Sequence, residues 1–280
     1  MTGLEFALAG TVLVALLGFA IGSFLNVVAY RVPLGLSVIA PASSCPGCGH
    51  EIEPRDNIPL VSWIMLRGRC RHCATTISAR YIAVEAITGA LFVAVALAFL
   101  PAVLTAPSLQ LGISSALVLV SFLYLAAISV ALAAIDLDVH RLPNRIVLPS
   151  YVVGVVLLGA AALVGGDLVR FATALAGAGV LTAFYLALAL VKPGGMGMGD
   201  VKLAGVIGLF LGYLGWAPLV VGTMGAFVLG GILGIVLMIT GVARRGSGIP
   251  FGPWMLTGAW LGIFAGERIA SGYLSLAGLS

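Results

Sequence analysis

The sequence predicts an all-α polytopic integral membrane protein of about eight transmembrane helices, with a small loop that carries four cysteines. Hydrophobic residues make up 61% of the 280-residue chain and charged residues only 9%, and the mean hydropathy is +1.18. Soluble domains carry about 25% charged residues, so a soluble fold is excluded. The 38 glycines are typical of membrane helices that pack closely, because small residues let two backbones approach each other.

The predicted helices are the uncharged runs that reach the roughly 20 residues needed to cross a bilayer. One uncharged segment of 41 residues is too long for a single crossing, and Gly215–Pro218 divides it into two. The predicted spans are Phe6–Tyr30, Ala86 to about Thr105, about Leu111 to Ile135, Ile146–Gly166, Phe171–Val191, two spans within Leu203–Ala243, and Ile249–Gly266. Because eight is even, we expect both termini on the same side of the membrane.

The basic residues orient these helices. Twelve of the 14 Lys and Arg residues fall in the segment 31–80 or in the connections after the third, fifth and seventh spans, and only Arg170 and Arg268 lie on the other side. The positive-inside rule then places the twelve in the cytoplasm and both termini outside. The net charge of +4 therefore reflects topology, and we expect contact with membrane lipid and no nucleic-acid partner.

Four cysteines in the loop form two CxxC pairs, Cys45 with Cys48 and Cys70 with Cys73, separated by 21 residues. Two such pairs predict one structural zinc site, because four thiolates complete a tetrahedral shell. Reduced free thiols and a redox pair are the alternatives, whereas structural disulfides do not fit a reducing cytoplasm. His50 and His72 lie close enough to the cysteines to be alternative ligands, but four thiolates already fill a closed site, so we expect both to be surface residues.

Two aspartates at helix ends are the candidate catalytic residues. Asp136 ends the third span and Asp200 precedes the sixth, so both are expected at the cytoplasmic face. Carboxylates at a membrane boundary are costly unless they are hydrated, paired or functional. Two adjacent carboxyl groups can share one proton and activate water, as in aspartic proteases. Alternatively, Asp136, Asp138 and Asp200 are interfacial charges or helix caps, with Asp200 well placed as an N-cap.

Many short motifs in order along nearly the whole chain resemble the bacterial type IV prepilin peptidases, which are integral-membrane aspartic proteases. These motifs are Gly22–Val28 with Arg31 and Pro33, the two CxxC pairs, Asp56–Pro59, Ser62-Trp63, Leu66–Arg71, Ile77–Glu85, Asp136 with Leu142-Pro143, Gly197-x-Gly199-Asp200-x-Lys202-Leu203, and Ile249–Pro253. Within this family the first catalytic aspartate lies six residues before the Leu-Pro pair. The resemblance thus selects Asp136 over Asp138, and Asp200 as its partner.

The resemblance implies cleavage of the short basic leader of prepilins or pseudopilins at the cytoplasmic face of a bacterial inner membrane. It also implies N-methylation of the new N-terminus from S-adenosylmethionine, because the cysteine loop is retained. The corresponding division is a first transmembrane helix at 1–30, a zinc-binding, methyltransferase-associated loop at 31–80, and a peptidase core at 81–280. The sequence has no glycine-rich nucleotide loop, so the cofactor is expected in a pocket between the loop and helix ends, or the chain only cleaves.

Glu85 is expected either to form an ion pair with Arg80 or Arg31, or to bind the amino group that cleavage frees.

Two other functions of the protein are also open. Another GxGD intramembrane aspartic protease, of the presenilin or signal-peptide-peptidase type, is expected to have Tyr-Asp at its first site and to lack the cysteine loop. The chain instead has Ile135-Asp136 and four cysteines. A zinc-regulated transporter is expected to place acidic residues near the middle of the membrane, whereas the acidic residues here lie at span ends.

Overall fold

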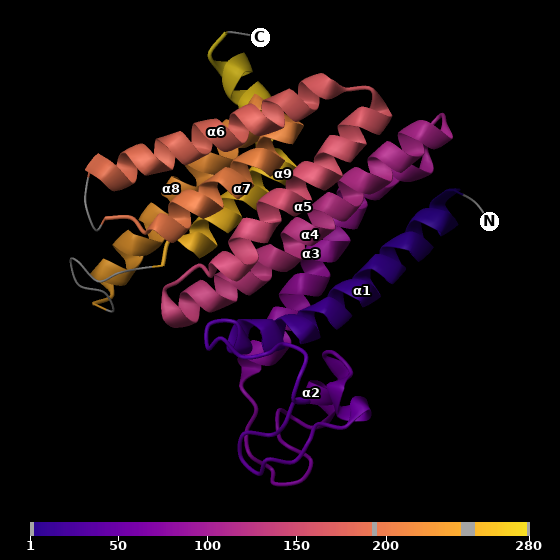
Figure 1. Ribbon diagram of the computed structural model, residues 1–280, viewed down its shortest axis with the longest axis vertical. Helices are drawn as coiled ribbons and strands as arrows, with labels where there is room; N and C mark the ends of the chain where they lie inside the picture. The colour runs from indigo at the N-terminus through magenta and orange to yellow at the C-terminus, as the bar shows by residue number, and fades with distance from the viewer. Residues whose placement is uncertain (1–2, 192–194, 242–249, 279–280) are drawn as a thin grey trace. The chain divides into compact units, whose positions relative to one another are not determined.

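The computed structural model describes residues 3–191, 195–241 and 250–278, and most of these residues are helical (Figure 1). Within them the only extended pairing consists of two isolated antiparallel bridges in the cysteine loop. The chain divides into two compact units, Met1–Ile135 and Asp136–Ser280. Helix α4 (Leu109–Val139) begins in the first unit, and its last residues belong to the second. The predicted all-α membrane fold is confirmed.

The first unit is built on a pair of adjacent helices, α1 (Gly3–Arg31) and α3 (Ala79–Leu104), which Figure 1 shows side by side. Glycines make this close packing possible. A Cβ atom on Gly18 would lie 2.6 Å from Cβ of Phe92, and one on Gly22 would lie 2.8 Å from Cα of Glu85. A larger residue at either position would push the two helices apart.

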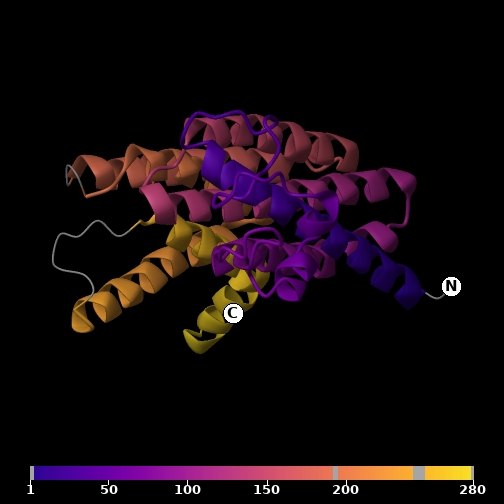
Figure 2. The same cartoon turned by 90° about the horizontal axis from the view of Figure 1, so that it is seen from below.

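The loop of residues 32–78 connects the end of α1 to the start of α3. Most of this loop is irregular chain (Figure 2). This loop contains two short helical pieces, η1 (Pro54–Asn57) and α2 (Val61–Met65). Each bridge closes one CxxC turn, pairing Ser44 with Glu51 and Arg69 with Thr76. The loop therefore consists of two similar hairpin-like turns and little regular structure.

The second unit contains α5 (Asn144–Gly165), α6 (Leu168–Val191), α7 (Met198–Leu214), α8 (Trp216–Ile239) and α9 (Gly252–Leu276). Helix α7 is central, because it packs against all four of the others. Its contact with α6 is the closest, since a Cβ atom on Gly177 would lie 2.5 Å from the backbone oxygen of Gly208. The central position explains why nearly all of α7 after Asp200 is buried.

Eight long helices in the described part of the chain correspond to the eight predicted spans. Six of them, α1, α3, α4, α5, α6 and α8, are long and apolar enough to cross a membrane. Helix α7 has 17 residues, about 26 Å at 1.5 Å per residue, slightly less than a bilayer core. Helix α9 begins at Gly252, and the first residue of the predicted eighth span, Ile249, lies outside the described residues.

Candidate active site and metal centre

Asp136 lies in the last turn of α4, and its side chain is buried, with 5% of the residue exposed. Its Oδ2 atom accepts a hydrogen bond of 3.1 Å from the backbone N–H of Gly252 at the start of α9. A Cβ atom on Gly252 would lie 2.7 Å from the same oxygen, so only glycine allows this approach. Asp138, the neighbouring candidate, is exposed. The structure therefore gives Asp136, and not Asp138, an enclosed carboxyl group.

Asp200 lies in the first turn of α7, where its carboxylate accepts a 3.3 Å hydrogen bond from the N–H of Gly197. Gly197 is the N-cap residue, so Asp200 occupies the third helical position and not the N-cap that its sequence context suggested. A carboxylate there satisfies a backbone donor that has no partner within the helix, and the helix dipole stabilises its charge. The hydrogen bond therefore holds the carboxyl group at the N-terminus of α7.

The two aspartates share one site in the second unit. Leu142, which follows α4, links their surroundings: a Cβ atom on Gly199 would lie 3.1 Å from its Cβ, and one on Gly252 would lie 3.4 Å from its Cδ2. The two carboxyl groups are also near enough to interact electrostatically. Segments that are far apart in sequence thus bring the two acidic residues to the surroundings of one leucine.

An aromatic cluster lies beside this pair and was not anticipated from the sequence. Tyr185 of α6 is 2% exposed and lies close enough to Asp200 for an electrostatic interaction. Phe251 stands directly before Gly252, and its ring centroid lies 5.3 Å from that of Phe227 and 6.4 Å from that of Tyr185. These rings come from α6, α8 and the start of α9, and no sequence motif joins them. They give the acidic pair an apolar flank, which suits a hydrophobic substrate segment.

The four cysteines come together in the first unit, with all four sulfur atoms within 4.8 Å of one another. The Sγ atoms of Cys45 and Cys73 are 3.7 Å apart. A tetrahedral zinc site with Zn–S bonds of about 2.3 Å requires sulfurs about 3.8 Å apart, whereas a disulfide requires about 2.05 Å. The cluster therefore has the spacing of a metal site.

The two turns that carry the cysteines have matching backbone geometry. The N–H of Cys45 bonds the carbonyl of His50, and the N–H of Cys70 bonds that of Thr75, both at 2.9 Å. The residue after each second cysteine has a positive φ, +70° at Gly49 and +56° at Ala74. Hydrogen bonds from the Thr75 hydroxyl and backbone lower the pKa of the Cys73 thiol to about 6. At Cys48 a hydrogen bond from the His50 backbone is outweighed by desolvation and the neighbouring sulfurs, which raise the pKa to about 11. The thiolate, the form that binds metals, is therefore favoured at Cys73 and not at Cys48 in the metal-free loop.

Glu85 organises the junction between the loop and α3. It is buried, and its Oε2 atom accepts a 2.7 Å hydrogen bond from the N–H of Leu60, the residue before α2. Arg31, one of its expected partners, instead donates to the carbonyl oxygens of Ser37 and Pro41 at 3.0 and 2.7 Å. The carboxylate of Glu85 thus fixes the path of the loop.

A hollow of about 340 Å³ lies between the end of α1 and the loop. One wall is a single helical face of α1, and the other is formed by the loop. The lining residues include Ser23, Phe24, Arg31, Ile39, Ala42 and Asn57. A cofactor pocket is expected from the sequence in this kind of place, between the loop and a helix end. Its volume is at the lower end of the range for small-molecule sites, which is about 300–1,000 Å³.

Two family models match the chain. Residues 16–99 match the bacterial peptidase A24 N-terminal domain, and residues 123–235 match the type IV leader peptidase family. A protein of Aeromonas hydrophila named prepilin leader peptidase/N-methyltransferase is 36% identical over 94% of this chain and 93% of its own. The chain belongs to the type IV leader peptidase family.

Two further relatives carry the same name. The protein of Pseudomonas aeruginosa is 32% identical, covering 94% of this chain and 93% of its own. That of Bacillus subtilis is 32% identical, covering 93% and 96%. No solved structure matches the chain. The N-terminal match includes all four cysteines and Glu85, and the peptidase match includes Asp136 and Asp200.

Proposed function

We propose that this protein removes the leader peptide of prepilin-like substrates with Asp136 and Asp200 as its catalytic pair, and then methylates the new N-terminus. One observation supports the peptidase assignment most strongly. The carboxyl groups of Asp136 on α4 and Asp200 on α7 lie in the same region, beside the N–H of Gly252. The family membership and the names of full-length relatives support both activities.

The chemistry follows from two carboxyl groups that hold one proton between them. Like charges at short range disfavour double ionisation, so one group is a carboxylate and the other a carboxylic acid. The carboxylate takes a proton from water, whose oxygen attacks the scissile carbonyl carbon, while the acid donates a hydrogen bond to the carbonyl oxygen. When the tetrahedral intermediate collapses, the C–N bond breaks and the leaving amine receives the proton taken from water.

The fixed donors around the pair prepare it for this reaction. The N–H groups of Gly252 and Gly197 each hold one carboxylate oxygen, which leaves the other oxygen of each group for water or substrate. Tyr185 and Phe251 flank the pair with apolar surface. Prepilin-like substrates place a hydrophobic helix directly after the cleaved bond, and we infer that the partly exposed ring of Phe251 contacts it.

The hollow beside α1 is our proposed site for S-adenosylmethionine, which supplies an electrophilic methyl group when bound. Arg31 stands at this hollow and suits the carboxylate of the cofactor, because guanidinium groups bind carboxylates well. Phe24 and Ile39 offer apolar contacts for an adenine ring. The four-cysteine site, with structural zinc, holds the loop that forms the second wall.

The orientation of the protein follows from its charges. We infer that the loop 31–80 and the aspartate pair face the cytoplasm and that both termini lie outside. In this arrangement residues 1–30 are the first transmembrane helix, the zinc-binding loop 31–80 serves methyl transfer, and 81–280 provides the peptidase core. Prepilin leaders are basic, so the positive-inside rule holds them on the same side as the aspartates.

Mass spectrometry of a prepilin incubated with the reconstituted protein tests both activities. We expect loss of the leader in all reactions, and addition of one methyl group only when S-adenosylmethionine is present. Loss of the leader without methylation would mean that the protein is only a peptidase and that its metal loop is structural. If several prepilins stay uncut, the peptidase assignment fails and a transporter becomes the better interpretation.

A further inference from the structure

A second group of metal-binding side chains lies beside the four cysteines and contains none of them. His50, Glu53 and His72 each offer one ligand atom, and these three atoms lie within 4.8 Å of one another. Both histidines are exposed and Glu53 is half-buried. All three belong to the first unit, so the group is internal to one compact body.

The two imidazole rings face each other closely. Their centroids are 3.7 Å apart, and the ring planes are tilted by 39°. Each histidine comes from a different CxxC turn, since His50 follows Cys48 by two residues and His72 directly precedes Cys73. The fold of the two turns therefore brings together two nitrogen donors that are 22 positions apart in sequence.

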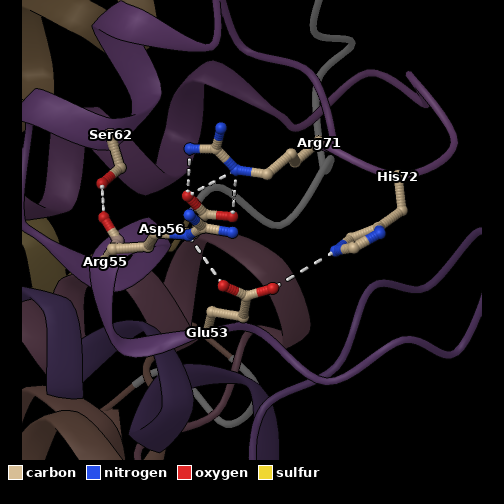
Figure 3. Close-up of polar contacts among 6 residues, drawn as sticks. All are labelled: Glu53, Arg55, Asp56, Ser62, Arg71 and His72. Carbon is tan, nitrogen blue, oxygen red and sulfur yellow. Dashed lines mark hydrogen bonds and ion pairs between the residues drawn. The ribbon is translucent and has the colours of Figure 1, made fainter.

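Glu53 supplies the third donor. Its Oε1 atom lies 3.8 Å from Nε2 of His72, as Figure 3 shows. Its other oxygen, Oε2, is held by Nε of Arg55 at 2.7 Å. Such a contact from outside the ligand set fixes the direction of a carboxylate and leaves one oxygen free for a metal.

The other charged groups nearby are already paired. Asp56 accepts two hydrogen bonds from Nε of Arg71, at 2.8 and 3.0 Å (Figure 3). The guanidinium of Arg71 therefore holds the pKa of Asp56 below its usual value, and the two charges offset each other. This leaves the carboxylate of Glu53 as the acidic group that faces the histidine pair.

We propose that His50, Glu53 and His72 form a second divalent-metal site, of the kind that binds zinc or cobalt. Two imidazoles and one carboxylate are a common ligand set for such ions. Metal–ligand bonds of about 2.0–2.2 Å place neighbouring donor atoms about 3.3–3.6 Å apart in a tetrahedral shell. Exposed side chains reach this spacing by small rotations from their present positions, and water completes the coordination.

The second site differs from the cysteine site in chemistry and effect. Four thiolates already complete the shell of the first ion, so the histidines are not needed there. Nitrogen and oxygen donors with open positions bind more weakly and exchange more readily than a closed tetrathiolate. An ion held by His50 and His72 links the two CxxC turns a second time, and through Glu53 it ties both turns to the segment that enters η1.

Cobalt titration of the full-length protein in detergent separates the two sites, because only thiolate-bound cobalt gives intense charge-transfer absorption. We expect that about one equivalent produces this absorption and that about one further equivalent binds without adding to it. The variants Glu53→Gln and His50→Ala/His72→Ala should lose the second equivalent and keep the first. Glu51→Gln, an exposed acidic neighbour outside the group, is the matched control and should keep both.

The thiolate absorption reports that the loop is folded in each variant. If a variant does not fold, histidine modification of the wild-type protein by diethylpyrocarbonate provides the answer. Zinc added beyond the first equivalent should protect His50 and His72 while leaving His140, the third histidine of the chain, unprotected. The proposal is overturned if only one equivalent binds, if the second survives both variants, or if the protection is absent.

Discussion

The backbone N–H of Gly252 donates a 3.1 Å hydrogen bond to Oδ2 of Asp136, across 116 positions of sequence. This contact joins the start of α9 to the end of α4. It orients the carboxyl group before any substrate arrives, and its close approach depends on the absence of a side chain at position 252.

Gly252→Ala should therefore damage catalysis without unfolding the protein. The added Cβ would lie 2.7 Å from Asp136 Oδ2, so the carboxyl group must move. A displacement of about 1 Å in a catalytic group costs about 100-fold in rate, and we expect a loss of that order in leader cleavage. Gly231→Ala is the control, because a Cβ there meets no atom within 4 Å. Equal activity of the two variants would contradict this role for Gly252.

Ala74→Gly should stabilise the cysteine loop. Ala74 has φ +56° at the position that glycine occupies in the first turn, and this left-handed conformation costs a non-glycine residue about 1 kcal/mol. We expect slower loss of zinc to a chelator in Ala74→Gly and faster loss in the reverse change, Gly49→Ala. A Cβ on Gly49 meets no atom within 4 Å, so the second variant isolates the backbone effect. Faster zinc loss from Ala74→Gly would refute this account.

The pair formed by Asp56 and Arg71 should make loop stability depend on acid. Hydrogen bonds from Arg71 lower the pKa of Asp56, so the stabilisation is complete above the unfolded pKa of about 4 and disappears as the pH falls through the lower folded value. Asp56→Asn should therefore be less stable than wild type at neutral pH and equally stable at strongly acidic pH. Thermal unfolding of both proteins at each pH measures the difference. A constant difference at all pH values would exclude this origin.

Filling the hollow beside α1 should separate the two activities. Ala42→Trp places a large side chain in the hollow, and we expect methylation to fall at least about tenfold as the space for a ligand is lost. Leader cleavage should stay within about twofold of wild type. Ala102→Trp, an exposed change on α3 outside the hollow, is the control. Equal loss of both activities in Ala42→Trp would mean that the loop has only a structural role.

Composition and uncharged runs predicted the helices well, because a bilayer demands long apolar segments. The same argument could not predict that α7 is short and enclosed by four other helices, since enclosure depends on packing. It also missed η1 and α2, which are too short to leave a periodic pattern.

At the site, the sequence singled out Asp136 and Asp200 but not their surroundings. The N–H of Gly252 and the ring of Tyr185 reach the pair only through tertiary packing. Asp200 was considered as an N-cap, yet Gly197 takes that position. For Glu85 the sequence suggests an arginine or a freed amino group as partner, and the structure adds one that charge does not predict, a backbone N–H of the loop.

Asparagine substitution of the two aspartates tests the central claim most directly. Asn keeps the size of the side chain but can neither share the proton nor accept one from water. We expect Asp136→Asn and Asp200→Asn each to lower the leader-cleavage rate by about 100- to 10,000-fold. Asp138→Asn, an exposed change two residues away, should cleave at the wild-type rate. Normal cleavage by a folded Asp136→Asn or Asp200→Asn protein would contradict the assignment of this pair as the catalytic centre.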